Sequence, residues 1–321
     1  MMNNKEKHEL ALMDPYLSIV RSFDVEDDRI LVGIKNVSSI PNTLMHKLEK
    51  CGFALHTIDK KSQLAGRAVD TQLINPLTGH YMSGSSSGTA LNVFAGINDL
   101  GIGNDGGGSV LAPAMCVNIL GFISKLIEPD RKINEKKNTD GMMAGNSLGF
   151  MSRDREILLK AISDSTGLKA ADSFGKVYSD QKYLNIESKI IKLKDAFTGR
   201  VELTNELKRI LSDCDVLIIR EGPVDLYGFG DSLFGHFDEE TRKIQNLSGK
   251  GYLRVANTAG ASAMVIPTDR LGCAIMLLSE SKPEKVARLL KAAEYIPHHR
   301  DELIERYFLN IESYRNDGYQ I

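Results

Sequence analysis

The segment "YMSGSSSGTALNVFAGINDLGIGNDGGGSVLAPAM", residues 81–115, contains two clusters of serine and glycine on either side of a short apolar stretch. The first cluster, residues 83–88, leads into "TALNVFAGI", whose apolar spacing predicts a helix that begins at the serines. Free N–H groups and the helix dipole favour negative charge at such a start. The second cluster, residues 106–109, has three successive glycines, so its main-chain N–H groups can converge as in an oxyanion hole.

Each cluster by itself also has an ordinary structural explanation. Most serine-glycine stretches are loops or helix caps. A phosphate-binding loop would also place glycine near a helix start, but "GNDGGGS" has neither the G-x-G-x-x-G nor the G-x-x-x-x-G-K-[ST] spacing. The clusters therefore need a wider context before they indicate a function.

The segments around the clusters predict strands mixed with helices. Short apolar runs at residues 29–35, 215–219, 262–267 and 273–278 are typical of buried strands. Helical spacing occurs at residues 42–52, 153–163 and 283–296. In the first of these, Asn42 or Thr43 is the expected N-cap and Gly52 the terminator, while Pro283 opens the third. This pattern predicts a layered α/β protein, and without a convincing boundary we treat residues 1–321 as a single domain.

Composition narrows the classes of function. A net charge of −2 and a pI near 6.4 leave no basic stripe for binding nucleic acid, so we expect no nucleic-acid partner. No run of about 18 apolar residues could span a membrane, and the N-terminus lacks the apolar core of a signal peptide, so we expect a cytoplasmic protein. The cysteines are scattered and the histidines dispersed, so the sequence indicates no metal site and implies no cofactor.

The two clusters, taken together with Lys35, resemble the amidase signature family. The family hallmark reads approximately GGSSGG, then an alanine-rich helix, then GTDTGGSIRxPA. Without a gap, "SGSSSG" aligns with the first block and "GNDGGGSVLAPA" with the second, and Ser85 and Ser109 are 24 positions apart, as in the family. The segment "ILVGIKNVSSIPNT", residues 30–43, is similar to the family's strand with the catalytic lysine. The likeness includes Asn75, Asn257 and Gly260 and covers most of residues 30–296.

The resemblance implies an α/β/α layered fold with a central mixed β-sheet flanked by helices, and it implies a set of catalytic roles. Ser109 would attack the substrate carbonyl, Ser85 would pass the proton onward, and Lys35 would accept it as a neutral amine. In the family the relay serine has a cis peptide bond, a strained feature. For this role the pKa of Lys35 must fall from ~10.4 to roughly 7, which burial without a carboxylate partner can achieve. Without the resemblance, Lys35 would pass for an ordinary lysine at a strand end.

The resemblance also implies how the glycine loop acts. Main-chain N–H groups of Gly106, Gly107, Gly108 and Ser109 would receive the negative charge that grows on the carbonyl oxygen. Asp105 would fix the loop, and Ser86 would help to hold it. As an isolated aspartate, Asp105 would be taken for a turn residue.

Several departures from the family pattern affect the prediction. Leu111 occupies the position of the family's arginine, Asn104 that of a threonine, and Ser87 that of a glycine. Only about fifty residues separate the predicted helix at 153–163 from the strand at 215–219, where family members are usually longer. This shortfall would leave the site open, or leave it to be completed by a partner subunit.

The aromatic segment at residues 221–240 has two explanations of about equal weight. It contains glycine together with Tyr227, Phe229, Phe234 and Phe237. The segment could form a mobile lid over the substrate. It could equally form a hydrophobic patch that docks a second subunit.

We therefore expect an amidohydrolase that cleaves the C–N bond of a small-molecule amide through an acyl-serine intermediate, without a cofactor. One alternative is an amidase-like scaffold that binds a ligand or partner without turnover. The other is an amidotransferase-type subunit. The sequence leaves the substrate open, and also the choice between a homo-oligomer and a complex with a partner subunit.

Overall fold

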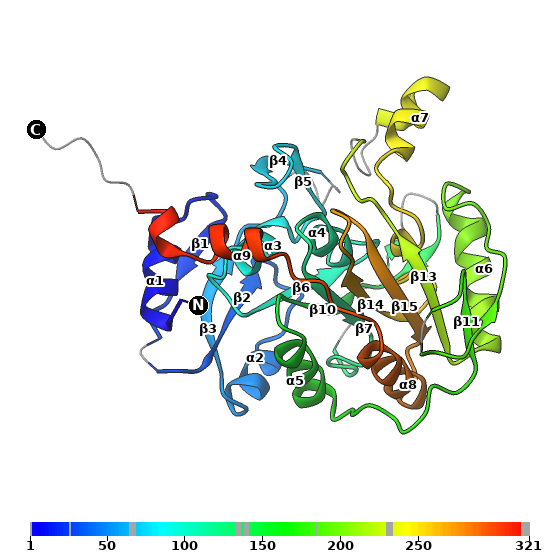
Figure 1. Ribbon diagram of the computed structural model, residues 1–321, viewed down its shortest axis with the longest axis horizontal. Coiled ribbons are helices and arrows are strands. Elements are labelled where there is room, and N and C mark those ends of the chain that lie inside the picture. The colour runs from blue at the N-terminus through cyan, green and yellow to red at the C-terminus, as the bar shows by residue number, and fades with distance from the viewer. Residues whose placement is uncertain are drawn as a thin grey trace, which may run out of the picture.

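The computed structural model describes residues 2–25, 27–63, 69–131, 136–137, 141–183, 185–228 and 234–315. At its centre lies an 11-stranded sheet (Figure 1). In spatial order the strands are β1 (Ile19–Ser22), β3 (Phe53–Asp59), β2 (Ile30–Lys35), β6 (Leu100–Asp105), β10 (Ser147–Ser152), β7 (Leu120–Ser124), β14 (Ala261–Pro267), β15 (Ala274–Glu280), β13 (Val216–Glu221), β11 (Val177–Ser179) and β12 (Lys189–Ile190). Two short pairs stand apart from it, β4 (Val69–Ile74) with β5 (Tyr81–Ser83), and β8 (Lys136–Lys137) with β9 (Met143–Ala144).

The sheet is mixed, as expected. Strand β2 is parallel to both β3 and β6, and β11 is parallel to both β12 and β13. The other neighbouring pairs are antiparallel. The four strands predicted from apolar runs are found as β2, β13, β14 and β15.

Helices cover both faces of the sheet, which confirms the α/β/α layering (Figure 1). One face carries α2 (Asn42–Glu49), α5 (Arg155–Thr166) and α8 (Pro283–Glu294), packed on a cluster that includes Val32, Phe122 and Leu277. The other face carries α3 (Ser87–Phe94), α4 (Leu111–Cys116) and α6 (Arg200–Asp213), packed on a cluster that includes Phe94 and Leu278. Burial of apolar side chains on both faces is what holds such a sheet between two helical layers.

The predicted helices begin and end close to where the sequence indicates. Pro283 occupies the first turn of α8, as expected. Helix α5 is capped by Asp154, whose side chain accepts from the N–H groups of Glu156 and Ile157. The expected side-chain cap of α2 is wrong, because its N-cap is Pro41 and the Thr43 hydroxyl donates instead to Glu128 at 2.9 Å.

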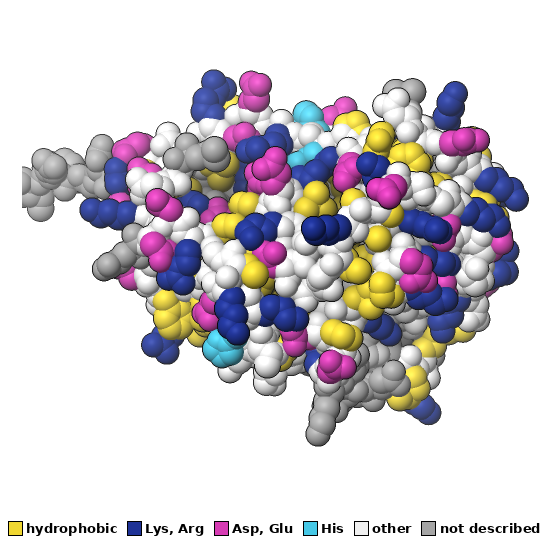
Figure 2. Space-filling view, turned by 90° about the horizontal axis from the view of Figure 1, so that it is seen from below, with side chains coloured by type: hydrophobic (Ala, Val, Ile, Leu, Met, Phe, Trp, Pro, Cys, Tyr) yellow, Lys and Arg dark blue, Asp and Glu magenta, His cyan; other side chains and the backbone are white. Residues whose placement is uncertain are grey.

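Elements near both chain ends pack beside α3. Helix α1 (Asn4–Met13) shares a buried cluster with residues around Ile97 and Ile311, and the Phe308 ring of α9 (Glu302–Phe308) lies 4.8 Å from the Phe94 ring. On the face formed by the lower side of the molecule in Figure 1, acidic and basic side chains are interspersed (Figure 2). Among the helices of the described residues, none combines the length and apolar character needed to cross a bilayer.

The order of the strands brings the predicted site together at one edge of the sheet. Parallel neighbours β2 and β6 end at Lys35 and Asp105, so their carboxyl ends lie side by side. The antiparallel neighbour β10 starts at this edge, with Ser147 opposite Asp105. Loops from three distant parts of the chain therefore meet there.

Candidate active site

Lys35 is buried at the end of β2. Its side chain is 3% exposed, and its Nζ lies 2.6 Å from Ser85 Oγ. The pKa of Lys35 is lowered to about 7, mainly by burial; Asp105 opposes this shift, and the nearby positive charge of Lys61 adds to it. An amine with a pKa near neutrality can act as a general base. The amine and the first hydroxyl thus lie at hydrogen-bond distance.

Asn104 is a second partner of Lys35 that the sequence did not point to. Its Oδ1 accepts from Lys35 Nζ at 2.8 Å, and its Nδ2 donates to Ser39 Oγ at 3.0 Å. A neutral amine that donates to Asn104 keeps its lone pair free for the proton of Ser85. The amide of Asn104, near the end of β6, therefore orients the amine, a role that its place at the family's threonine did not indicate.

Ser85 is held between β5 and the start of α3. It is 7% exposed, and its carbonyl accepts from the Ser62 N–H at 3.3 Å. The cis peptide bond implied by the resemblance is absent here, because the only cis bond among the described residues is Gly222–Pro223. Gly84 instead adopts a φ of +79°, in the left-handed region that glycine tolerates, so the chain turns before Ser85 by that means.

The neighbouring serines hold the cluster in ways the sequence only partly indicated. The hydroxyl of Ser86 is buried and has no hydrogen-bond partner among the described residues, and it lies 2.7 Å from where a Cβ on Gly103 would stand. Ser86 therefore supports the loop by packing closely on β6 rather than by bonding. Ser87, at the departure from the family pattern, donates to Asp70 at 2.7 Å and ties α3 to β4.

Asp105 organises the glycine loop from beneath. Its fully buried carboxylate accepts from the N–H groups of Gly108 and Val110, both at 2.7 Å, and from that of Leu111 at 3.3 Å. Burial raises the pKa of Asp105, while these donors and Lys35 act in the opposite direction. The expected loop-fixing role agrees with these contacts. They also differ from the expected oxyanion hole, because the N–H of Gly108 is already engaged.

Asn257 clamps the same loop from the other side. Its Nδ2 donates to the carbonyls of Gly106 at 3.2 Å and Gly145 at 2.5 Å, while its Oδ1 accepts from Ser147 Oγ at 2.6 Å. Within the described residues, no hydrogen bond is made by the N–H groups of Gly106, Gly107 or Ser109. Those three donors are the ones available to a ligand.

Ser109 lies partly exposed at the end of the glycine loop. No hydrogen bond joins its hydroxyl to Ser85 or to any other described residue, so the second half of the expected relay is open in this structure. Catalytic hydrogen bonds in unliganded enzymes are often long and tighten only when substrate binds. The structure thus assembles Lys35 with Ser85, and Asp105 with the loop that carries Ser109, as two groups at one edge.

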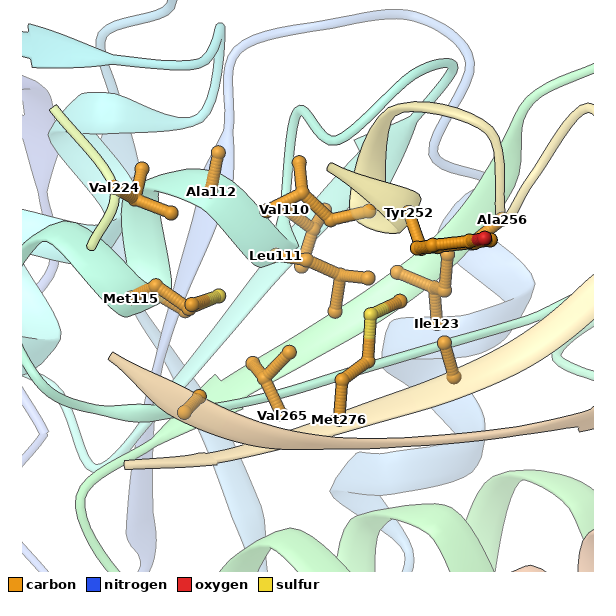
Figure 3. Packing of buried hydrophobic residues seen from close by; sticks show 14 of the residues in the cluster. Val110, Leu111, Ala112, Met115, Ile123, Val224, Tyr252, Ala256, Val265 and Met276 are labelled. Atoms are coloured by element: carbon orange, nitrogen blue, oxygen red, sulfur yellow. The ribbon is translucent and has the colours of Figure 1, made fainter. Parts of the chain in front are cut away.

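Leu111, which occupies the position of the family's arginine, faces the interior. It is fully buried in an apolar cluster with Val110, Met115, Val265 and Met276 (Figure 3). A guanidinium there would need a partner that this cluster does not offer. The apolar side chain of leucine therefore suits the apolar surroundings of this position.

The aromatic segment is only partly within the described residues. Tyr227 is 62% exposed and Phe237 is 79% exposed, and Phe234 opens the 3₁₀ turn η1 (Phe234–His236). Phe229 lies outside the described residues. Both explanations for the segment, lid and docking patch, stay predictions.

Comparison with known protein families identifies the segment around the serine and glycine clusters. Residues 69–131 match the family model described as Amidase. A glutamyl-tRNA(Gln) amidotransferase subunit from Methanosphaera stadtmanae is 26% identical over 176 residues, which cover 52% of this chain and 35% of that protein. The same subunit from Methanothermobacter thermautotrophicus is 28% identical over 130 residues, covering 37% of this chain and 28% of that protein. The matches thus span about a third of these curated relatives.

Solved structures share the fold along most of the chain. The corresponding glutamyl-tRNA(Gln) amidotransferase subunit of Thermotoga maritima superposes with a TM-score of 0.61 and 15% identity, covering 91% of each chain. A 6-aminohexanoate cyclic dimer hydrolase complexed with substrate superposes with a TM-score of 0.66 and 12% identity, covering 96% of each chain. At these identities the likeness is one of fold.

Proposed function

Because this chain belongs to the amidase signature family, we propose that it is an amidohydrolase that cleaves a carboxamide through an acyl-serine intermediate at Ser109. The observation that carries the proposal is the buried amine of Lys35, 2.6 Å from Ser85 Oγ and with a pKa of about 7. A serine hydroxyl is a poor nucleophile at neutral pH, so it needs such a base.

The first half of the proposed reaction forms the acyl-enzyme. Ser109 Oγ attacks the amide carbonyl as its proton passes to Ser85 Oγ, and the proton of Ser85 passes to the lone pair of Lys35. The tetrahedral intermediate then collapses, the C–N bond breaks, and the leaving amine takes the proton back from Lys35 through Ser85. In the second half, water attacks the acyl-serine with the same proton path, which releases the acid and restores Ser109.

The oxyanion of the proposed intermediate is received by main-chain donors. We assign this role to the N–H groups of Gly106, Gly107 and Ser109, since that of Gly108 bonds to Asp105. Loss of one such donor typically costs about 3 kcal/mol in the transition state. Asp105 and Asn257 position these donors before the substrate arrives.

A second candidate is an amidotransferase-type subunit that works within an assembly. Two observations favour it: the curated relatives are amidotransferase subunits, and Tyr227 and Phe237 are exposed on one segment. Co-purification of the native protein with a second polypeptide, lost when Tyr227 and Phe237 are both changed to serine, would support this candidate.

A fluorophosphonate probe tests the proposed chemistry. We expect covalent labelling at Ser109, located by peptide mass spectrometry, and its loss in Lys35→Ala. Release of ammonia from a panel of small amides should be lost in each of the two single variants, Ser109→Ala and Lys35→Ala. Well-folded wild-type protein that neither labels nor releases ammonia would point to a scaffold without turnover.

A further inference from the structure

Arg131 occupies a part of the site that the proposed reaction does not use. It follows the exposed residues Pro129 and Asp130, yet its own side chain is half-buried. One guanidinium nitrogen, Nη1, donates to the Ser39 carbonyl at 3.3 Å, and the other, Nη2, donates to the Asn146 carbonyl. The guanidinium thus bridges two loops.

Both of these loops border the proposed catalytic groups. Ser39 accepts from Asn104, which in turn accepts from Lys35. On the other side, Asn146 Oδ1 lies 2.8 Å from where a Cβ on Gly106 would stand, so Asn146 lies against the glycine loop. Arg131 therefore sits at the rim between the amine of Lys35 and the proposed oxyanion donors.

The charge of Arg131 is not balanced within the described residues. It forms no ion pair there, and the exposed Asp130 beside it in the chain does not bond to it. Burial lowers the pKa of Arg131, and no carboxylate opposes that influence. Within the described residues, its Nε–H makes no hydrogen bond. A half-buried guanidinium without a counter-ion favours an anionic ligand.

Lys61 adds a second positive charge near Lys35. Lys61 is exposed and close enough to Lys35 to lower its pKa. The nearby carboxylate of Asp105 is fully buried and committed to three N–H groups. A substrate that reaches Lys35 therefore meets the positive charges of Arg131 and Lys61, which complement a carboxylate.

We propose that Arg131 binds a carboxylate group of the substrate, so that the protein acts on amides that carry a second, anionic end. This inference rests on the proposed function, since it names the substrate class of the same site. Two of the five N–H groups of Arg131 bond to carbonyls of the described residues, and the other three are enough for a paired interaction with a carboxylate. Arg131 determines specificity, and it takes no part in the proton path.

The test compares succinamate, the monoamide of succinic acid, with the uncharged butyramide. Wild-type protein should have the higher kcat/KM for succinamate. Arg131→Gln, which retains N–H donors for the main-chain carbonyls without the charge, should lower that ratio at least tenfold, and Arg131→Lys should restore part of it. Hydrolysis of butyramide should change less than threefold.

Arg155→Met is the matched control. Arg155 is also half-buried and bonded to a main-chain carbonyl, that of Ile296 at 2.6 Å, but it lies on α5 away from the site. This variant should leave the ratio unchanged. Equal loss on both substrates in Arg131→Gln, or no wild-type preference for succinamate, would overturn the inference and leave Arg131 as a structural bridge between loops.

A binding measurement separates this inference from the proposed hydrolysis. Titration calorimetry of succinamate with Ser109→Ala protein should give binding that Arg131→Gln weakens at least tenfold, whether or not the native protein turns over. Arg131-dependent binding without hydrolysis would support the anion site and count against the amidase. Absence of binding and of hydrolysis would overturn both.

Discussion

Lys35 is the residue on which the proposed chemistry depends, and its burial also affects stability. Its pKa in the folded protein is about 7, below its usual value of 10.5, so the unfolded chain binds more protons between these two values. The free energy of unfolding due to Lys35 therefore rises with pH across this window and is flat below it. At neutral pH the buried amine is a destabilising feature, as functional groups often are.

Replacement of Lys35 should accordingly stabilise the protein at neutral pH. Lys35→Met should raise the free energy of unfolding at pH 7 by up to about 4 kcal/mol, reduced by the contribution of the two hydrogen bonds that the amine no longer makes. The gain should shrink as the pH rises towards the value at which the wild-type amine is neutral in both states. Urea unfolding at pH 7 and pH 9 measures it, and an identical difference at both values would mean that the amine is not buried as described.

Asp105 should be the residue least tolerant of an isosteric change. In Asp105→Asn an amide N–H₂ faces main-chain N–H groups, so at least one of the three donors loses its acceptor. We expect a loss of about 2 kcal/mol in the free energy of unfolding and slower labelling of Ser109. Asp164→Asn, at a surface pair on α5, is the control and should change little. Equal effects of the two substitutions would rule out the anchoring role of Asp105.

The sequence predicted the role of a single residue where that residue belongs to a recognisable pattern. It did not predict roles that depend only on the three-dimensional arrangement. Lys35 and Ser85 could be paired because each lies in a segment that resembles a block of the family pattern, and the structure brings them together. Asn104 bonds to Lys35 through a register between β2 and β6 that sequence spacing does not reveal. The hydrogen bond from the Gly108 N–H to Asp105 likewise depends on the orientation of one peptide group, which the sequence does not reveal.

At the scale of elements, the turn before α3 is a sensitive point. Gly84 has a φ of +79°, and a Cβ there would stand 2.5 Å from the Pro113 side chain in α4. Gly84→Ala should therefore lower the free energy of unfolding by about 2 kcal/mol or more and, by moving Ser85, lower kcat. Denaturant unfolding and amide hydrolysis measure the two effects.

Gly79 provides the matched comparison for Gly84. It has a similar φ of +71°, but nothing lies within 4 Å of the position that a Cβ would take. Gly79→Ala should lower the free energy of unfolding by only about 1 kcal/mol and leave kcat unchanged. If the two variants behave alike, the close contact with Pro113 does not position the serine turn.

Elements were predicted best where apolar runs are long. Strands β2, β13, β14 and β15 follow from such runs, and α8 from its apolar face and Pro283. Short edge strands such as β1 and β12 could not be predicted from apolar runs, because their residues are mostly exposed. The cap of α2 was mistaken because Thr43 found a partner in Glu128, a residue distant in sequence.

At the scale of the whole molecule, the sheet order brings distant groups into one site. Strands β2 and β6 are neighbours although β3, β4 and β5 lie between them in sequence, and this places Lys35 beside the loop that carries Ser109. Layering on a central sheet follows from the alternation of strands and helices. The order of eleven strands does not, because it depends on pairings between residues far apart in the chain.

The rate at which a fluorophosphonate labels Ser109, measured against pH, tests this assembly most directly. A base with a pKa of about 7 must be neutral to accept the serine proton, so the rate should rise with pH to a plateau with an apparent pKa near 7. In Lys35→Met the rate should be lower and lack this step. A wild-type rate without a step near pH 7, or a step that persists in Lys35→Met, would contradict the account.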